Sequence, residues 1–264
     1  MGFFPLSLNG KHALVAGSTQ GIGLASAQIL AQLGANCTLI SRNEGKLKEA
    51  LLTLQNEGQQ THNYLVADFS NPNELKGIAE QFFASNTVHI LVNNSGGPAA
   101  GAILEATPEA FLAAFNQHLI CNQILTTLAF PGMNAAGWGR IINIISTSVK
   151  VPLKGLGVSN TIRAAVASWA KTMSIELGPF GITVNNVLPG ATATGRLEAI
   201  INGKSSRLGA SKDVVMEAML EEIPARRFAA PEEIAAMVAF LASEAAGYVN
   251  GTSIPVDGGR TGSI

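Results

Sequence analysis

The segment HALVAGSTQGIG, residues 12–23, predicts how the chain begins to fold. A short apolar run, 12–16, leads into a turn in which Gly17, Gly21 and Gly23 have the spacing G-x-x-x-G-x-G, and a helical pattern follows over 21–33. Glycines at such a turn let the backbone bend sharply and approach a pyrophosphate, while the helix N-terminus offers free N–H donors. This order of strand, glycine turn and helix predicts a dinucleotide-binding βαβ unit.

The alternation of strands and helices continues along the rest of the chain. Further apolar runs predict strands at 37–40, 63–67, 89–93, 140–145, 182–188 and 253–256. Helical patterns fill the intervals at 44–57, 72–84, 107–134, 158–178 and 231–243. Because the strands are continuously apolar, helices are expected to cover both faces of the sheet. The sequence therefore predicts an α/β fold of the Rossmann type, a doubly wound and mainly seven-stranded parallel sheet with helices on both faces.

The chain of 264 residues is predicted to form a single domain, 1–264, because no repeat, linker or low-complexity tract interrupts it. One part of it, 194–224, is more polar and contains Gly195, Gly203 and Gly209. We expect this part to form a mobile, partly helical flap over a substrate pocket, since lids come from the less stable parts of a fold. A tolerated surface insertion is the alternative.

Composition argues against several classes of partner and site. Lys and Arg total 17 against 18 acidic residues, a net charge of −1, which does not favour nucleic acid. No apolar run approaches the ~18 residues of a membrane span, and the first ten residues lack the basic start of a signal peptide. Cys37 and Cys121 are predicted to be buried free thiols, and no cysteine–histidine spacing is typical of zinc. We expect a cytoplasmic protein with no metal.

The residues after the second predicted strand bear on the choice of cofactor. An NAD site usually has Asp or Glu there, bonded to the 2′-hydroxyl of the adenosine ribose. This chain has Ser41, Arg42 and Asn43 instead. A guanidinium is a permanent cation with several donors, which suits a 2′-phosphate. We therefore predict that NADP(H) is preferred over NAD(H); a solvated arginine at a strand end is the alternative.

Further motifs resemble those of the short-chain dehydrogenase/reductase family, and most of all its 3-oxoacyl-carrier-protein reductases. They are the glycine turn, Asp68 after the third strand, Asn93–Gly96 at the fourth, Asn143–Ser146 at the fifth, Pro189, Gly190 and Thr194 after the sixth, and Val256–Gly259 at the last. The resemblance covers nearly the whole chain. It implies hydride transfer between a nicotinamide and a small carbonyl or alcohol substrate, with an acyl thioester among the candidates.

The resemblance also implies which residues would bind the cofactor. The glycine turn and the ends of the second, third and fourth strands would hold the phosphates and adenosine, and the loop after the sixth strand would hold the nicotinamide side. The predicted cofactor-binding residues are Gly17, Ser18, Thr19, Gln20, Gly21, Ile22, Gly23, Ser41, Arg42, Asp68, Phe69, Asn94, Ser95, Gly96, Arg163, Pro189, Gly190, Thr192 and Thr194.

The family's catalytic residues are matched only in part. The family uses a serine to polarise the carbonyl, a tyrosine as general acid/base, a lysine that lowers the pKa of that tyrosine, and an asparagine that helps hold a water relay. Ser146 matches the serine, whereas the positions of the other three hold Ser159, Arg163 and His118. The chain therefore resembles a divergent subgroup with an imperfect catalytic tetrad.

These replacements leave the proton donor open. Arg163 can donate to nicotinamide-ribose hydroxyls but stays protonated, and the hydroxyl of Ser159 is a poor general acid. Lys150 could give up a proton if partly desolvated, and His118 has a pKa suited to proton relay; a solvated lysine and a structural histidine are the alternatives. We expect an NADP(H)-dependent oxidoreductase with a non-standard proton donor, or else a catalytically weak or inactive NADP(H)-binding sensor or partner subunit.

The long helical patterns at 107–134 and 158–178 bear on assembly. They carry few charges for their length, and the second contains four alanines that would allow close helix approach, Ala164, Ala165, Ala167 and Ala170. Related proteins pair these helices about a two-fold axis. We therefore expect a homodimer or homotetramer, with packing of the same surface inside one subunit as the alternative.

Overall fold

The structure is a computed structural model, which describes residues 6–56 and 60–263. The described residues form one seven-stranded sheet with the strand order β3-β2-β1-β4-β5-β6-β7, in which every pairing is parallel. The predicted Rossmann-type sheet is confirmed. Its strands are β1 (His12–Ala16), β2 (Asn36–Ser41), β3 (Asn63–Val66), β4 (Ile90–Asn93), β5 (Gly139–Ile144), β6 (Ile182–Pro189) and β7 (Ser253–Val256).

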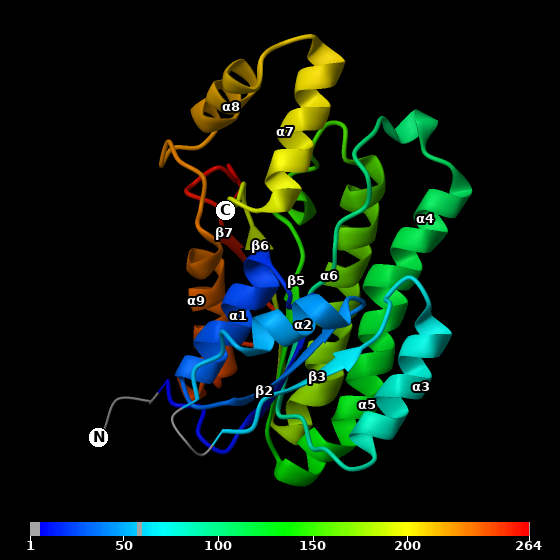
Figure 1. Cartoon of the computed structure of the whole chain (residues 1–264), viewed down its shortest axis with the longest axis vertical. Helices are drawn as coiled ribbons and strands as arrows, with labels where there is room; N and C mark the ends of the chain where they lie inside the picture. The colour runs from blue at the N-terminus through cyan, green and yellow to red at the C-terminus, as the bar shows by residue number, and fades with distance from the viewer. Residues whose placement is uncertain (1–5, 57–59, 264) are drawn as a thin grey trace.

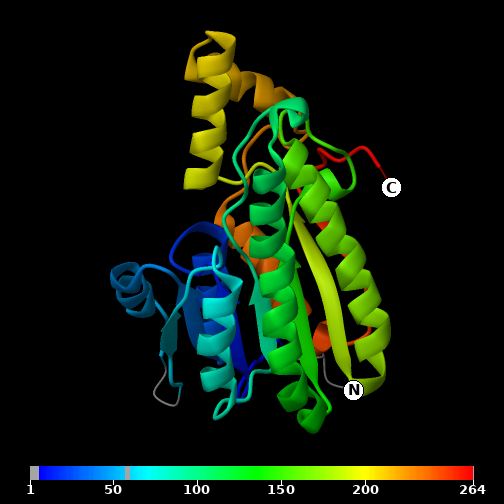
Figure 2. The same cartoon turned by 90° about the vertical axis from the view of Figure 1, so that its right-hand side faces the viewer.

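Helices cover both faces of this sheet (Figure 1). On one face lie α1 (Gly21–Gln32), α2 (Glu44–Leu51) and α9 (Pro231–Ala242). The other face carries α3 (Pro72–Phe83), α4 (Pro108–Phe115), α5 (Cys121–Ala136) and α6 (Gly157–Leu177). The long helices α5 and α6 run along the sheet in Figure 2. The predicted three-layer arrangement is thus observed.

The two faces have separate apolar cores because neighbouring residues of a strand point in opposite directions. Val15 and Val92 pack in the core beneath α1 and α9, whereas Leu14 and Leu91 pack in the core beneath α3 and α5. Cys37 and Cys121 are free and buried in these two cores, as predicted, and burial raises the pKa of both thiols to about 12. No helix within 6–56 and 60–263 has the length and apolarity needed to span a bilayer.

A row of polar side chains crosses four neighbouring strands of the sheet. The amide of Asn93 on β4 donates to Asn143 on β5 (2.9 Å), Asn143 donates to Asn186 on β6 (3.0 Å), and Asn186 donates to the hydroxyl of Ser253 on β7 (3.0 Å). The three asparagines are buried, so these bonds form away from water. We call these four residues the amide ladder.

Two predicted helices differ from those observed. The pattern at 107–134 predicts one helix. The chain is helical throughout this stretch, but a π-helical turn, Asn116–Ile120, separates α4 from α5. The helix predicted at 44–57 ends at Leu51, because Thr53 and Leu54 instead bond to carbonyls three residues back; its last residue, 57, lies outside the described residues. π-Helical turns are rare and occur frequently at functional sites.

The segment 194–224, expected to be a partly helical flap, forms two helices, α7 (Gly195–Leu208) and α8 (Lys212–Glu221). They extend beyond the sheet, past the carboxyl ends of its strands (Figures 1 and 2). A small core of their own joins them, formed by Leu197, Ile201, Val215 and Met219. The segment is therefore a packed helical pair; its action as a lid stays a prediction.

Candidate functional site

The turn between β1 and α1 has glycine where a side chain would not fit. Gly17 and Gly21 have φ angles of +59° and +55°, which favour glycine. A Cβ on Gly23 would lie 2.2 Å from the carbonyl oxygen of Gly17. The residue before α1, Gln20, makes no side-chain cap, so the first N–H groups of the helix are left for another acceptor. This cradle of backbone donors fits a pyrophosphate.

A hollow of about 350 Å³ opens beside this turn, at the carboxyl ends of β1, β2, β3 and β4. It lies where strand order reverses between β1 and β4, the usual place of a ligand in such sheets. Ten predicted cofactor residues line it: Gly17, Thr19, Gln20, Ser41, Arg42, Asp68, Phe69, Asn94, Ser95 and Gly96. The lining also includes Asn43, Lys46, Ala67 and Gln117, which were not predicted.

The rim of the hollow at β2 carries two cations. Arg42 and Lys46 are both exposed there, and Asn43 caps α2 by accepting a hydrogen bond from the N–H of Lys46 (2.9 Å). The N–H of Ser70 and, to a smaller extent, the charge of Arg42 lower the pKa of Asp68, so this carboxylate is ionised. Lys46 was missed, although its place in the first turn after Arg42 was a usable signal.

Two further predicted residues shape the turn from behind. The side chain of Ser18 is fully buried, and its hydroxyl accepts a hydrogen bond from the N–H of Ile40 (3.1 Å), so it does not line the hollow. A cofactor contact by Ser18 would have to come from its backbone, and it stays a prediction. Asn94 donates to the carbonyls of Ala16 and Gly17 (both 3.2 Å), which holds the turn against the end of β4. Ile22, also predicted, packs partly into the core.

The loop after β6 returns to the glycine turn. A Cβ on Gly21 would lie 3.1 Å from the methyl of Thr194, so these two residues are neighbours. The hydroxyl of Thr194 donates to the carbonyl of Thr192, and the hydroxyl of Thr192 donates to the carbonyl of Gly190 (both 3.2 Å). Gly190 passes so close to β7 that a Cβ there would lie 2.7 Å from Asp257. The predicted residues Pro189, Gly190, Thr192 and Thr194 thus form one loop beside the phosphate cradle.

A hydrogen bond from Arg163 joins α6 to the end of β5, close to Ser146. Arg163 donates from Nη1 to the carbonyl of Ile144 (2.9 Å), two residues before Ser146. Ser159 lies one turn earlier on α6, and its side chain is also buried. Burial lowers the pKa of Arg163 to about 10, and the guanidinium remains a cation at neutral pH. The hydroxyl of half-buried Ser146 accepts from the N–H of Ser148 (3.1 Å).

His118 lies within the π-helical turn and is only 1% exposed. Its Nδ1 is 2.6 Å from the hydroxyl of Ser95, while Nε2 has no hydrogen-bond partner among the described residues. Burial and the charges of Arg163 and Arg196 lower the pKa of His118 to about 2. The expectation of a pKa near neutrality is therefore wrong, and the ring is uncharged at ordinary pH.

Lys150 and the tyrosines lie elsewhere. Lys150 follows the 3₁₀ turn Thr147–Val149 and is exposed, so the partial burial expected for it is absent. Tyr64 lies in β3, where its hydroxyl donates to Glu44 (3.0 Å). Tyr248 is fully exposed on the loop before β7. Neither tyrosine of the chain lies beside Ser146 or Ser159.

One residue near this site was missed entirely. Arg196, in the first turn of α7, donates from Nη2 to the carbonyl of Pro98 (2.5 Å) in the loop after β4. Its guanidinium also covers Gly97, where a Cβ would lie 3.3 Å from Nη2. The only sequence signal was its position two residues after Thr194. The loop that it reaches belongs to a distant part of the chain.

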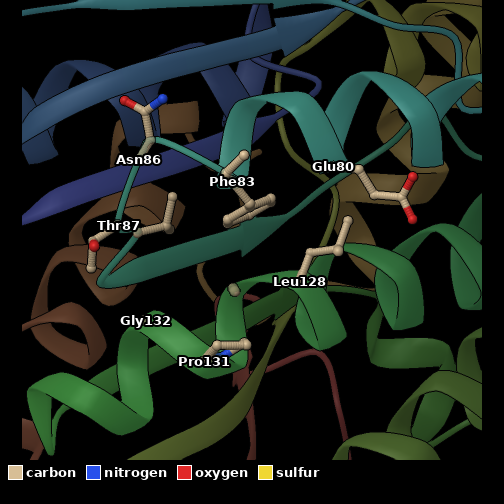
Figure 3. Close-up of a pocket in the computed structure, with 10 residues that line it drawn as sticks. Glu80, Phe83, Asn86, Thr87, Leu128, Pro131 and Gly132 are labelled. Carbon is tan, nitrogen blue, oxygen red and sulfur yellow. The ribbon is translucent and has the colours of Figure 1, made fainter.

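A second hollow, of about 280 Å³, lies between α3 and α5 at the opposite edge of the sheet (Figure 3). Its lining includes Glu80, Phe83, Thr87, Leu128 and Pro131. Glu80 is the single ionisable side chain among its lining residues, none of which was predicted to act in binding or catalysis. Over 6–56 and 60–263 there is also no cluster of three or more potential metal-ligating His, Cys, Asp and Glu side chains.

Comparisons with known proteins agree along nearly the whole chain. Residues 16–261 match the family model described as Enoyl-(Acyl carrier protein) reductase. The chain is 33% identical over 256 residues to D-beta-hydroxybutyrate dehydrogenase of Cupriavidus necator, covering 96% of this chain and 98% of that protein. It is 32% identical over 258 residues to the NADPH-dependent reductase BacG of Bacillus subtilis, covering 96% and 99%.

A solved structure gives the same result for the fold. The crystal structure of L-sorbose reductase from Gluconobacter frateurii, complexed with NADPH and L-sorbose, matches with a TM-score of 0.91 and 30% identity. The match covers 98% of this chain and 100% of that one. The strands, helices and loops described above therefore correspond over the full length of a structure that holds a nicotinamide cofactor.

Proposed function

The chain belongs to the short-chain dehydrogenase/reductase family of oxidoreductases, and from this premise we propose that it uses NADP(H) to interconvert a carbonyl and a hydroxyl group. The observation that carries the proposal is the hollow beside the glycine turn, with Arg42 and Lys46 on its rim. The resemblance of the chain's sequence to 3-oxoacyl-carrier-protein reductases makes oxoacyl compounds the first substrates to test.

The residues present fit the cofactor. The backbone around Gly17 and the start of α1 would hold the pyrophosphate, and Thr194 would close the cradle from the loop after β6. Arg42 and Lys46 would bind the 2′-phosphate, which agrees with NADPH in the names of BacG and of the sorbose reductase complex. The bound cofactor supplies the hydride that reduces the carbonyl carbon.

The chain's own residues would stabilise the oxygen that gains the electron pair. Ser146 would donate a hydrogen bond to the carbonyl oxygen, and the fixed charge of Arg163 would favour the alkoxide as it forms. The proton would then come from water, passing through Ser159 or through the neutral ring of His118. In this proposal the non-standard proton donor is a relay, since an uncharged imidazole can accept a proton on one nitrogen and give one up from the other.

A second candidate is favoured by a specific observation. Ser159 and Arg163 occupy the positions at which the family resemblance implies tyrosine and lysine, and both tyrosines of the chain lie far from Ser146. General acid catalysis typically contributes about 100- to 10,000-fold, so a protein without its acid would turn over slowly or not at all. Such a chain would be an NADP(H)-binding sensor or partner subunit.

Binding and turnover measured on the same protein separate these candidates. Calorimetry with NADPH and NADH should show heat for both and tighter binding of NADPH. Oxidation of NADPH should then be followed with 3-oxoacyl thioesters, quinones and small ketones. Ser146→Ala should lower kcat by about 100-fold or more and leave the Kd of NADPH unchanged. Binding without turnover on any substrate would favour the second candidate, and no heat with either nucleotide would exclude both.

We also propose that α5 and α6 pair across a two-fold axis in a homodimer. Ala164 is exposed on α6, together with Ile175 (68%), and Phe180 (40%) lies just beyond the helix, whereas Ala170 is buried within the subunit and cannot take part. Ile175→Glu should shift the mass measured by light scattering toward the monomer. Leu52→Glu, at an 87% exposed position after α2, is the matched control and should not change the mass.

A further inference from the structure

Two arginines, one bonded at the end of β5 and one at the loop after β4, have no acidic partner among the described residues. Arg163 is 8% exposed and donates to the backbone carbonyl of Ile144. Arg196 likewise donates to the backbone carbonyl of Pro98. The ion pairs formed within 6–56 and 60–263 involve other basic residues, among them Arg140, Arg227 and Arg260. These two cations therefore lack a counter-charge in the described part of the chain.

The two guanidinium groups share one environment with His118. The charge of Arg196 lowers the pKa of Arg163, and both arginines lower the pKa of His118, with no acidic group acting in the opposite direction. Because a buried cation is costly to leave unpaired, such a group is normally matched by an anion. The neutral imidazole supplies none. A ligand with a negative charge would therefore supply the anion that these two arginines lack.

The position of Arg196 indicates that this charge belongs to the substrate. Thr194 touches Gly21 of the phosphate cradle, whereas Arg196, on the next residues of α7, reaches away to Gly97 and Pro98. These two residues follow Gly96, the last residue of the β4 loop that lines the cofactor hollow. Arg196 therefore lies beyond the cradle.

We propose that the substrate is a small oxo or hydroxy acid whose carboxylate is bound by Arg196, with the charge of Arg163 strengthening its binding. A guanidinium presents parallel donors that match the two oxygens of a carboxylate. Because Arg196 is carried by α7, the bound carboxylate would also link this helix to the loop after β4. This proposal rests on the proposed function and adds the chemical class of the substrate.

The first experiment needs no variant. Three acids that differ in the distance from carbonyl to carboxylate, 2-oxobutanoate, 3-oxobutanoate and 4-oxopentanoate, are compared with their methyl esters on the wild-type protein. Calorimetry gives the Kd of each for the complex with NADP⁺, and kcat/KM is measured with NADPH. At least one acid should bind about 10- to 100-fold more tightly than its ester, the value of a charge-assisted hydrogen bond. Equal binding of acid and ester in all three pairs would overturn the proposal.

Variants then assign the effect to Arg196. Arg196→Gln should remove the advantage of the acid, leave binding of the ester unchanged, and alter the Kd of NADPH by less than about twofold; Arg196→Lys should retain part of the advantage. Lys212→Gln, which removes an exposed cation from α8, is the matched control. If Arg196→Gln weakens NADPH binding and leaves the preference for acid intact, Arg196 contacts the cofactor and the proposal is wrong.

The two proposals can fail separately. If the protein shows no NADPH binding, the proposed function fails, and the acid–ester comparison on the protein alone still decides whether this pair of arginines selects a carboxylate. If NADPH binds but no substrate turns over, the Kd ratio between acid and ester decides it in the same way.

Discussion

The cofactor end and the substrate end of this site are built in different ways. At the cofactor end, Gly17, Gly21 and Gly23 shape a backbone cradle within seven consecutive residues. At the substrate end, the groups are side chains from distant elements, with Arg163 on α6 and Arg196 on α7. The first end therefore depends on local shape, and the second on how remote segments meet. Variants at each end should fail in different ways.

The largest effect is expected in the cradle. In Gly23→Ala the new methyl would meet the carbonyl oxygen of Gly17 at 2.2 Å, and backbone must move to relieve it. Overpacking of this kind typically costs about 1–3 kcal/mol of stability, and a shift of about 1 Å at the phosphates should weaken NADPH binding by about 100-fold. Chemical denaturation and calorimetry measure the two effects.

The control for this variant is Gly77→Ala on α3, where a Cβ meets nothing within 4 Å. It should stabilise the protein by up to about 1 kcal/mol, because alanine is the better helix former, and should leave NADPH binding unchanged. If Gly23→Ala behaved like this control, the cradle would not depend on close backbone approach.

The next effect tests side-chain recognition at the cofactor end. Arg42→Gln should weaken binding of NADPH by about 10- to 100-fold and leave binding of NADH nearly unchanged, since only the former offers a 2′-phosphate. Lys76→Gln, at an exposed position of α3, serves as the control for loss of one positive charge. An equal loss for both nucleotides would show that Arg42 acts on the whole electrostatic field and does not select the phosphate.

A third prediction concerns pH at the substrate end. The pKa of His118 is about 2 in the folded protein and near 6.5 when unfolded, so the unfolded chain binds a proton first as pH falls. The free energy of unfolding should therefore decrease by up to about 1.4 kcal/mol per pH unit below pH 6 from this residue alone. His118→Gln should show a shallower slope between pH 6 and 4 in urea titrations. An unchanged slope would mean that the folded ring is charged.

The smallest effect is expected at Lys150, which is exposed beside the site. Lys150→Met should change kcat/KM by less than about twofold, because an exposed side chain on a loop holds no defined position against a substrate. A loss of tenfold or more, with the Kd of NADPH unchanged, would restore this lysine as the proton donor and remove the relay through Ser159 or His118.

The same contrast explains what could be predicted from the sequence. Arg42, Asp68 and Ser95 were placed correctly around one hollow because each follows a parallel strand, and the carboxyl ends of parallel strands meet at one edge. The inward side chain of Ser18 and the reach of Arg196 depend on contacts with remote residues, which no local pattern reports. The low pKa of His118 likewise follows from burial and from two arginines far away in the chain.

The amide ladder across β4, β5, β6 and β7 has a consequence for how this half of the sheet comes apart. Every amide in it donates in the same direction, so a flip of Asn143 or Asn186, or a displacement of β5 or β6 by one residue, would break bonds on both sides at once. Such coupling penalises opening any one of these strands alone. Backbone amides of the four strands should therefore exchange with deuterium as a single cooperative unit. During refolding, the loops that carry the reacting groups would become ordered together.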